Sequence, residues 1–145
     1  MANAPEIRDT MRLKDNTFSE VKSLPTVGIA AYCVGFDINA LTAKGARLAE
    51  MELELSHPAL AVGLMVNADT LDFTILGDTA LPIDASSVEV ATILKSLGAG
   101  GVGCAAGKVR FKIPSDFSYR YISVAATHTG TGAPQTANMT ITLNF

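Results

Sequence analysis

Apolar and polar residues alternate with a period of two in five segments of this chain. Successive side chains of a β-strand point to opposite faces, so each segment has one face suited to a core and one that tolerates water. The pattern therefore predicts packed antiparallel sheets. The five segments run over residues 50–55, 70–75, 108–113, 119–125 and 139–145.

Two further segments are apolar without a clean alternation. Residues 26–38 are rich in valine, isoleucine and aromatic residues and predict a buried strand, which Gly28 and Gly35 would weaken or bend. Residues 59–68 fit either a short strand or a loop packed across the end of the sheets. Glycine, proline and polar residues predict loops at residues 39–45, 77–85, 98–107 and 128–137.

Residues 86–97 fit two structures. Ser86 and Glu89 match a helical capping box, and the apolar residues that follow recur at helical spacing. The β-branched residues Val90 and Ile93 favour a strand instead, and we interpret the segment as a strand with a helix as the alternative. About seven or eight short strands separated by turns predict an all-β fold, an antiparallel two-sheet β-sandwich or jelly roll.

Residues 1–24 differ from the rest of the chain because they carry a large share of its charge and show no sustained period. We predict an extended N-terminal arm, with one helical turn near residues 18–22, followed by a jelly-roll domain over residues 25–145. Two interpretations of the arm stay open: a disordered terminus, or a segment that orders on a neighbouring subunit. The apolar residues that such a contact would use are Leu13, Phe18, Val21 and Leu24.

The composition is apolar for a soluble monomer, with 48% hydrophobic residues, 17% charged residues and a mean hydropathy of +0.30. A membrane span needs about 20 consecutive apolar residues, and the most apolar run, residues 58–66, is broken by Gly63. We therefore expect no membrane partner and predict that partner subunits cover part of the apolar surface.

The net charge is −3, and acidic and basic residues are interspersed along the chain without a basic block, which argues against nucleic-acid binding. Residues 1–16 lack the apolar core of a secretory signal.

Two rows of opposite charge are predicted on strand faces, because side chains two positions apart share a face. One row is Glu50, Glu52 and Glu54, and the other is Lys108, Arg110 and Lys112. The favoured interpretation is a solvated outer face on which the rows neutralise each other, at about 0.2–1 kcal/mol for each cross-strand pair. The alternative is that one row meets a complementary charge on another subunit.

Residues that could carry chemistry are few and scattered. We interpret Cys33 and Cys104 as small buried hydrophobes, with a disulfide between them left open. His57 and His128 are predicted to be solvent-exposed loop residues, and they do not supply the cluster that a metal needs. Residues 98–103 fit G-x-G-x-x-G, but the dinucleotide fingerprint needs a strand before it and a helix after it, so we predict a mobile loop. The sequence therefore predicts no catalytic residues, no cofactor and no enzyme.

A turn signal lies between two of the predicted strands, at Pro114, Ser115 and Asp116. Arg120 is expected to pair with Asp116 across this turn and to fix how the next strand enters the sheet. We interpret Pro114, Asp116 and Arg120 as structural residues.

The same turn carries a resemblance to a known family. Phe-Lys-Ile-Pro-Ser-Asp at 111–116, then Arg-Tyr-Ile at 120–122 and Thr-Ile-Thr-Leu-Asn-Phe at 140–145, resembles a pattern of small capsid cement (decoration) proteins of tailed bacteriophages. Further matching stretches extend the resemblance over most of residues 17–145. They are Phe18-Ser19, the run 27–38, Leu53-Glu54-Leu55 and residues 69–75.

The resemblance implies a jelly-roll cement protein that binds the outside of a phage shell and clamps neighbouring major capsid subunits. It implies a homo-oligomer, a homodimer or homotrimer, that is made in the host cytoplasm and ends on the outer capsid surface of the virion. The alternative is a carbohydrate-binding jelly-roll module for host adhesion, which would need exposed aromatic residues. The chain has no tryptophan, six phenylalanines and three tyrosines, mostly at positions that face the core.

Overall fold

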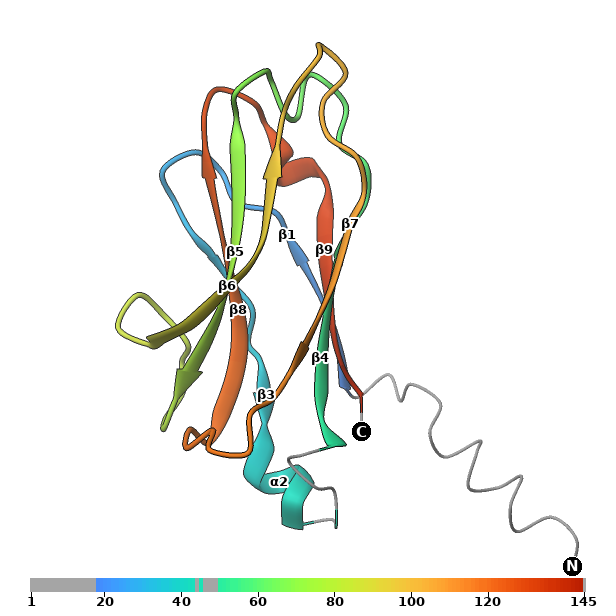
Figure 1. Cartoon of the computed structure of the whole chain (residues 1–145). Coiled ribbons are helices and arrows are strands. Elements are labelled where there is room, and N and C mark those ends of the chain that lie inside the picture. The colour runs from blue at the N-terminus through green and yellow to red at the C-terminus, as the bar shows by residue number, and fades with distance from the viewer. Residues whose placement is uncertain (1–17, 44, 46–49, 145) are drawn as a thin grey trace, which may run out of the picture.

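Two antiparallel β-sheets face each other and form a β-sandwich (Figure 1). The computed structural model describes residues 18–43, 45 and 50–144. Sheet A has the strand order β1–β9–β4–β7, and sheet B has the order β2–β8–β5–β6, with β3 also paired to β8. Sheet A contains β1 (Ser19–Ser23), β4 (Glu52–His57), β7 (Gly107–Lys112) and β9 (Asn138–Asn144). Sheet B contains β2 (Ala31–Tyr32), β3 (Phe36–Asp37), β5 (Thr70–Asp78), β6 (Val88–Leu97) and β8 (Tyr121–Thr129).

The all-β prediction is confirmed, and so is each of the five alternating segments. They correspond to β4, β5, β7, β8 and β9, and the core between the sheets takes apolar residues from every one of these strands, whereas Leu76, Tyr121 and Ala125 lie on the outer face of sheet B. Residues 88–97 form strand β6, so the choice of a strand over a helix is also confirmed. No helix among the described residues is long and apolar enough to cross a membrane.

The segment from 26 to 43 differs from its prediction. In place of one buried strand it forms the short strands β2 and β3, because the chain turns at Gly35, which has a φ of +89°. Residues predicted to be a loop form helix α2 (Ile38–Ala43). Asp37 caps this helix by accepting a hydrogen bond from the Ala40 N–H at 3.2 Å, and Ile38 and Leu41 bury one face.

The described part of the predicted arm belongs to the sandwich. Residues 19–23 form β1, which pairs antiparallel with β9, in place of the predicted helical turn. Leu24 is buried in the core, and Phe18 packs against the same core. The strand was missed because β1 has one polar face and an edge position, so only one neighbouring strand specifies its structure.

The core lies between the sheets, where side chains such as Met51, Leu53, Phe73, Ile75 and Ile141 are completely buried. A second, smaller cluster lies on the outer face of sheet B. There the loop after β5 folds back, and its Ile83 packs on Leu76 and Ala125, with Tyr32 and Tyr121 at the rim. Such satellite clusters are common under long loops.

The loops gather at the two ends of the sandwich. Residues 24–30, 58–69, 98–106 and 130–137 lie at the upper end in Figure 1, which we call the loop end. Helix α2 and the loop 113–120 lie at the opposite end, and the loop 79–87 projects sideways from sheet B in the lower half of the view. This division separates the two groups of loops that a partner could contact.

Candidate functional site

The loop end is organised around Asp69, a buried carboxylate just before β5. Its Oδ2 accepts hydrogen bonds from the Gly132 N–H at 2.8 Å and the Val66 N–H at 3.1 Å. Its Oδ1 accepts a bond from the Thr131 N–H at 3.1 Å. One side chain therefore joins the loop 58–69 to the loop 130–137.

His128 provides a further contact to the same carboxylate. Its Nε2 lies 3.2 Å from Asp69 Oδ2, and both side chains are buried. Burial alone would raise the pKa of Asp69, but the backbone hydrogen bonds and the His128 bond outweigh it and hold the pKa below its ordinary value of 3.8. The carboxylate is therefore ionised at neutral pH and acts as a fixed acceptor for the loop end.

Both histidines differ from the prediction of solvent-exposed loop residues. His57 is the last residue of β4, is buried, and stacks on Phe73 with ring centroids 5.4 Å apart. Its Nδ1 donates to the Pro58 carbonyl at 2.8 Å, and its Nε2 accepts from the Ser96 hydroxyl at 2.8 Å. The prediction failed because the flanking proline and glycine signals indicate a turn but do not reveal that a strand extends up to it.

The glycine-rich segment 98–103 is held against the rest of the loop end, contrary to the mobile loop that we predicted. The Gly98 N–H donates to the Asp69 carbonyl at 2.9 Å, and the Gly101 N–H donates to Asn67 Oδ1 at 2.8 Å. A Cβ on Gly98 or Gly103 would overlap carbonyl oxygens of residues 66 and 60. Glycine is needed here for close approach of two backbones, and β7 follows the segment where a nucleotide site needs a helix.

Four exposed aliphatic residues lie in three loops of the loop end, and two of these loops, 58–69 and 98–106, belong to the hydrogen-bonded base. They are Val27, Ile29, Val62 and Val102. Ile29 is 69% exposed and Val102 is 77% exposed, so both side chains face solvent almost fully. Ile29 also borders a hollow of about 410 Å³ between β1 and β2. We call these four residues the aliphatic group of the loop end.

The two charge rows meet on the outer face of sheet A, as predicted. Glu54 lies directly across from Arg110 in the register of β4 and β7, with Arg110 Nε 3.1 Å from its Oε2 and Lys108 Nζ 3.5 Å from its Oε1. Glu54 is only 6% exposed, because β9 flanks β4 on the other side. Two of the three basic residues thus neutralise a buried carboxylate of their own chain. Lys112 lies across from Glu52, whose carboxylate is 3.8 Å from Arg110.

The remaining predicted site residues are separated from one another. Leu13 lies outside the described residues. Val21 is exposed on β1, whereas Leu24 is inside the core and unavailable for a partner. The predicted contact set is therefore divided between surface and interior.

Arg120 pairs with a different carboxylate from the one predicted. Its guanidinium lies 2.9 Å from Asp37 Oδ2, and its Nε is 3.3 Å from both oxygens of Asp37. The Arg120 bond lowers the pKa of Asp37, and the pair joins β3 to the turn before β8. The turn prediction for Pro114 is confirmed, since its carbonyl accepts a bond from the Phe117 N–H at 3.1 Å. Asp116 could be chosen from the sequence only because it is near in the chain, whereas Asp37 is 83 positions away.

The two cysteines are free thiols. Burial, followed by the nearby Glu20 carboxylate, raises the pKa of Cys33 far above its ordinary range. Burial also raises the pKa of Cys104, which is only partly covered. The interpretation as small apolar residues is confirmed for Cys33 and holds in part for Cys104.

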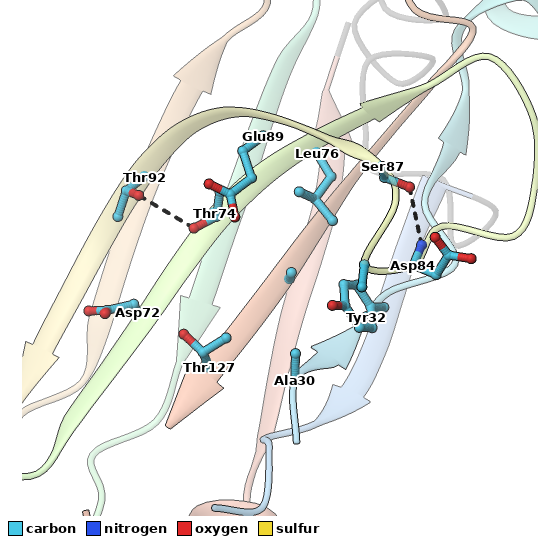
Figure 2. Close-up of a pocket in the computed structure, with 12 residues that line it drawn as sticks. Ala30, Tyr32, Asp72, Thr74, Leu76, Asp84, Ser87, Glu89, Thr92 and Thr127 are labelled. Carbon is cyan, nitrogen blue, oxygen red and sulfur yellow. Dashed lines mark hydrogen bonds between the residues drawn. The ribbon is translucent and has the colours of Figure 1, made fainter. Parts of the chain in front are cut away.

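A polar hollow of about 260 Å³ lies on the outer face of sheet B (Figure 2). Thr74 and Thr92 face each other on one side, with hydroxyl oxygens 3.4 Å apart, while Tyr32 and Asp84 lie on the other. Asp72 and Thr127 form the lower rim. Asp84 is tied to its own loop by hydrogen bonds from Ser86, which lower its pKa. The hollow offers hydroxyl and carboxylate groups around a single aromatic ring.

No group of three or more potential metal ligands occurs among the described residues. In the comparisons with known proteins, no family model matches this chain and no curated protein matches it.

Proposed function

We propose that this chain is a structural virion protein, a cement protein that binds the outside of a phage shell and clamps neighbouring major capsid subunits. The observation that carries the proposal is the aliphatic group of the loop end, in which Val62 and Val102 lie in loops that Asp69 and the glycine segment hold in place. Exposed aliphatic side chains on a fixed base suit binding by apolar burial, at about 25 cal/mol for each Å². The phage shell is proposed as the partner because residues 111–116 and 120–122 resemble a pattern of phage cement proteins.

The order of the strands supports the jelly-roll part of this proposal. The chain changes sheet after β1, β3, β4, β6, β7 and β8, and it stays in sheet B between β2 and β3 and between β5 and β6. Each sheet is thereby built from both halves of the chain, as expected when two Greek keys are wound together. The four loops of the loop end then come together although they are far apart in sequence.

The test is binding to shells assembled from the major capsid protein of the same phage. Val102→Asp and Ile29→Asp place a charge in the aliphatic group, and each is expected to lower the bound fraction in co-sedimentation by about ten-fold. Leu81→Asp is the matched control, since Leu81 is 51% exposed but lies in the loop 79–87, away from the loop end. The proposal fails if the wild-type chain does not bind the shells, or if all three variants bind equally well.

A second candidate function, carbohydrate binding for host adhesion, is favoured by the hollow on sheet B. Its hydroxyls and carboxylates can hydrogen-bond to sugar hydroxyls, and Tyr32 offers a ring edge beside them. A volume of about 260 Å³ suits one sugar ring better than a chain. A glycan-array signal that Thr127→Val abolishes and Val102→Asp preserves would select this function over the first.

A further inference from the structure

Among the strands that the structure describes, β1 is an edge strand of sheet A, and its sequence is complementary to itself. Its residues are Ser19, Glu20, Val21, Lys22 and Ser23. If a second β1 lay antiparallel to it with the two Val21 residues opposite each other, Glu20 of each copy would face Lys22 of the other. Opposite charges directly across paired strands stabilise the pair, whereas like charges destabilise it.

The other sheet edges in the described part of the chain lack this property. If two β7 strands paired antiparallel with their Arg110 residues opposite each other, Lys108 of each copy would face Lys112 of the other, and all of these residues are basic. Strand β6 is irregular, with register shifts between residues 73 and 74 and between 75 and 76 of its partner β5, and such bulges protect an edge from pairing. Strands β2 and β3 have two residues each. Among these edges, β1 is the one suited to a second copy.

Exposed aliphatic residues also concentrate beside β1. Val21, at the centre of the strand, is 63% exposed, and Val34, next to the strand, is 68% exposed. Val34 is held there because its N–H donates to Glu20 Oε2 at 2.8 Å, while the Gly35 N–H donates to Oε1 at 3.0 Å. This contact fixes the Glu20 side chain at the edge, so less side-chain entropy is lost when a partner's lysine approaches.

We propose that two copies of this chain form a two-fold dimer by antiparallel pairing of their β1 strands, centred on Val21. The two four-stranded A sheets then become one continuous sheet, and each Glu20 pairs with Lys22 of the other copy. The interface is isologous, as most homodimer interfaces are. It uses the side edge of the sandwich and none of the loops that carry Val62 and Val102, so it does not depend on the cement function.

Cysteine cross-linking of the full chain tests the register. Residues directly opposite in an antiparallel pair have Cα atoms about 4.5–5.5 Å apart, within the range for a disulfide. Val21→Cys is therefore expected to give a disulfide-linked dimer under mild oxidation. Ser19→Cys is the matched control, because its counterpart would lie four residues along the strand, roughly 14 Å away. The wild-type chain gives the background from Cys33 and Cys104.

Light scattering after size exclusion tests the pairing without any cross-link. The wild-type chain is expected at twice its mass of 15.1 kDa. Lys22→Glu opposes two glutamates at two symmetric positions and should weaken the dimer by about ten-fold or more. Lys95→Glu, which makes the same charge change on β6, should leave the dimer unchanged. A monomeric wild-type chain, equal cross-linking of the two cysteine variants, or equal dimerisation of the two glutamate variants would each overturn the proposal.

Discussion

Asp69 and His128 are 59 positions apart in the chain, yet Asp69 Oδ2 lies 3.2 Å from His128 Nε2 inside the loop end. Asp69→Asn replaces one carboxylate oxygen by an NH2 group, which cannot accept a hydrogen bond from a backbone N–H. Since a buried donor left without its acceptor costs about 1–3 kcal/mol, and several depend on this one carboxylate, we expect the variant to lose about 3 kcal/mol. Urea unfolding followed by circular dichroism measures this loss.

Asp72→Asn is the control for that measurement. Asp72 is half-buried on the outer face of sheet B and pairs loosely with Lys95, at 3.8 Å. Such a pair contributes at most about 1 kcal/mol. If the Asp72 variant lost as much stability as the Asp69 variant, the special role of Asp69 at the loop end would be contradicted.

The same carboxylate gives the protein an acid-sensitive end. Because its pKa in the folded chain is held below the ordinary 3.8, the folded state gains stability from it above that pH. This stability disappears as the pH falls through 3.8 and then through the lower folded pKa. We expect the free energy of unfolding to fall below about pH 5 and to fall less steeply in Asp69→Asn. A residual slope should come from Asp37, Asp78 and Asp84, whose pKa values are also lowered.

Gly103 and Gly101 should respond differently to alanine. Both have positive φ, at +81° and +70°, but a Cβ on Gly101 would meet open space, whereas one on Gly103 would overlap the Leu60 carbonyl. We expect Gly101→Ala to cost about 1 kcal/mol from its backbone conformation alone. Gly103→Ala should cost about 3 kcal/mol or more, because it also separates residues 60 and 104, which form a two-way backbone bridge. Equal melting temperatures for the two variants would contradict this account.

The parts of the fold that could be predicted are those in which one strand face is buried. In β4, β5 and β9 the alternation of apolar and polar residues is enforced by the core, so the sequence alone reveals strand and face. The pairing of the charge rows on β4 and β7 followed from the same periodicity. Strand β1 and helix α2 were missed because each is short and is stabilised mainly by contacts from elsewhere in the chain.

The candidate site was harder to predict because its geometry depends on long-range contacts. Asp69 resembles any aspartate before a strand until the fold brings residues 130–132 against it. The glycines of 98–103 suggested flexibility, while their close approach to the backbone of residues 60–66 becomes visible only in three dimensions. One signal could have been used: two glycines flank Thr131 just after His128, as a loop that closely approaches another segment requires.

The pair of Arg120 and Asp37 provides a final prediction, because the sequence favoured Asp116 as the partner of Arg120. A double-mutant cycle with Asp37→Ala and Arg120→Ala should give a coupling free energy of about 0.5–1 kcal/mol. The value is modest because Arg120 is half-exposed, although its guanidinium bonds both carboxylate oxygens. The same cycle with Asp116→Ala should give a coupling free energy near zero.

Asp37 also caps α2, so Asp37→Ala alone should lower the free energy of unfolding more than Arg120→Ala does, by about 1 kcal/mol. Stronger coupling of Arg120 to Asp116 than to Asp37 in urea unfolding would show that the arginine fixes the 113–120 turn instead of joining it to β3.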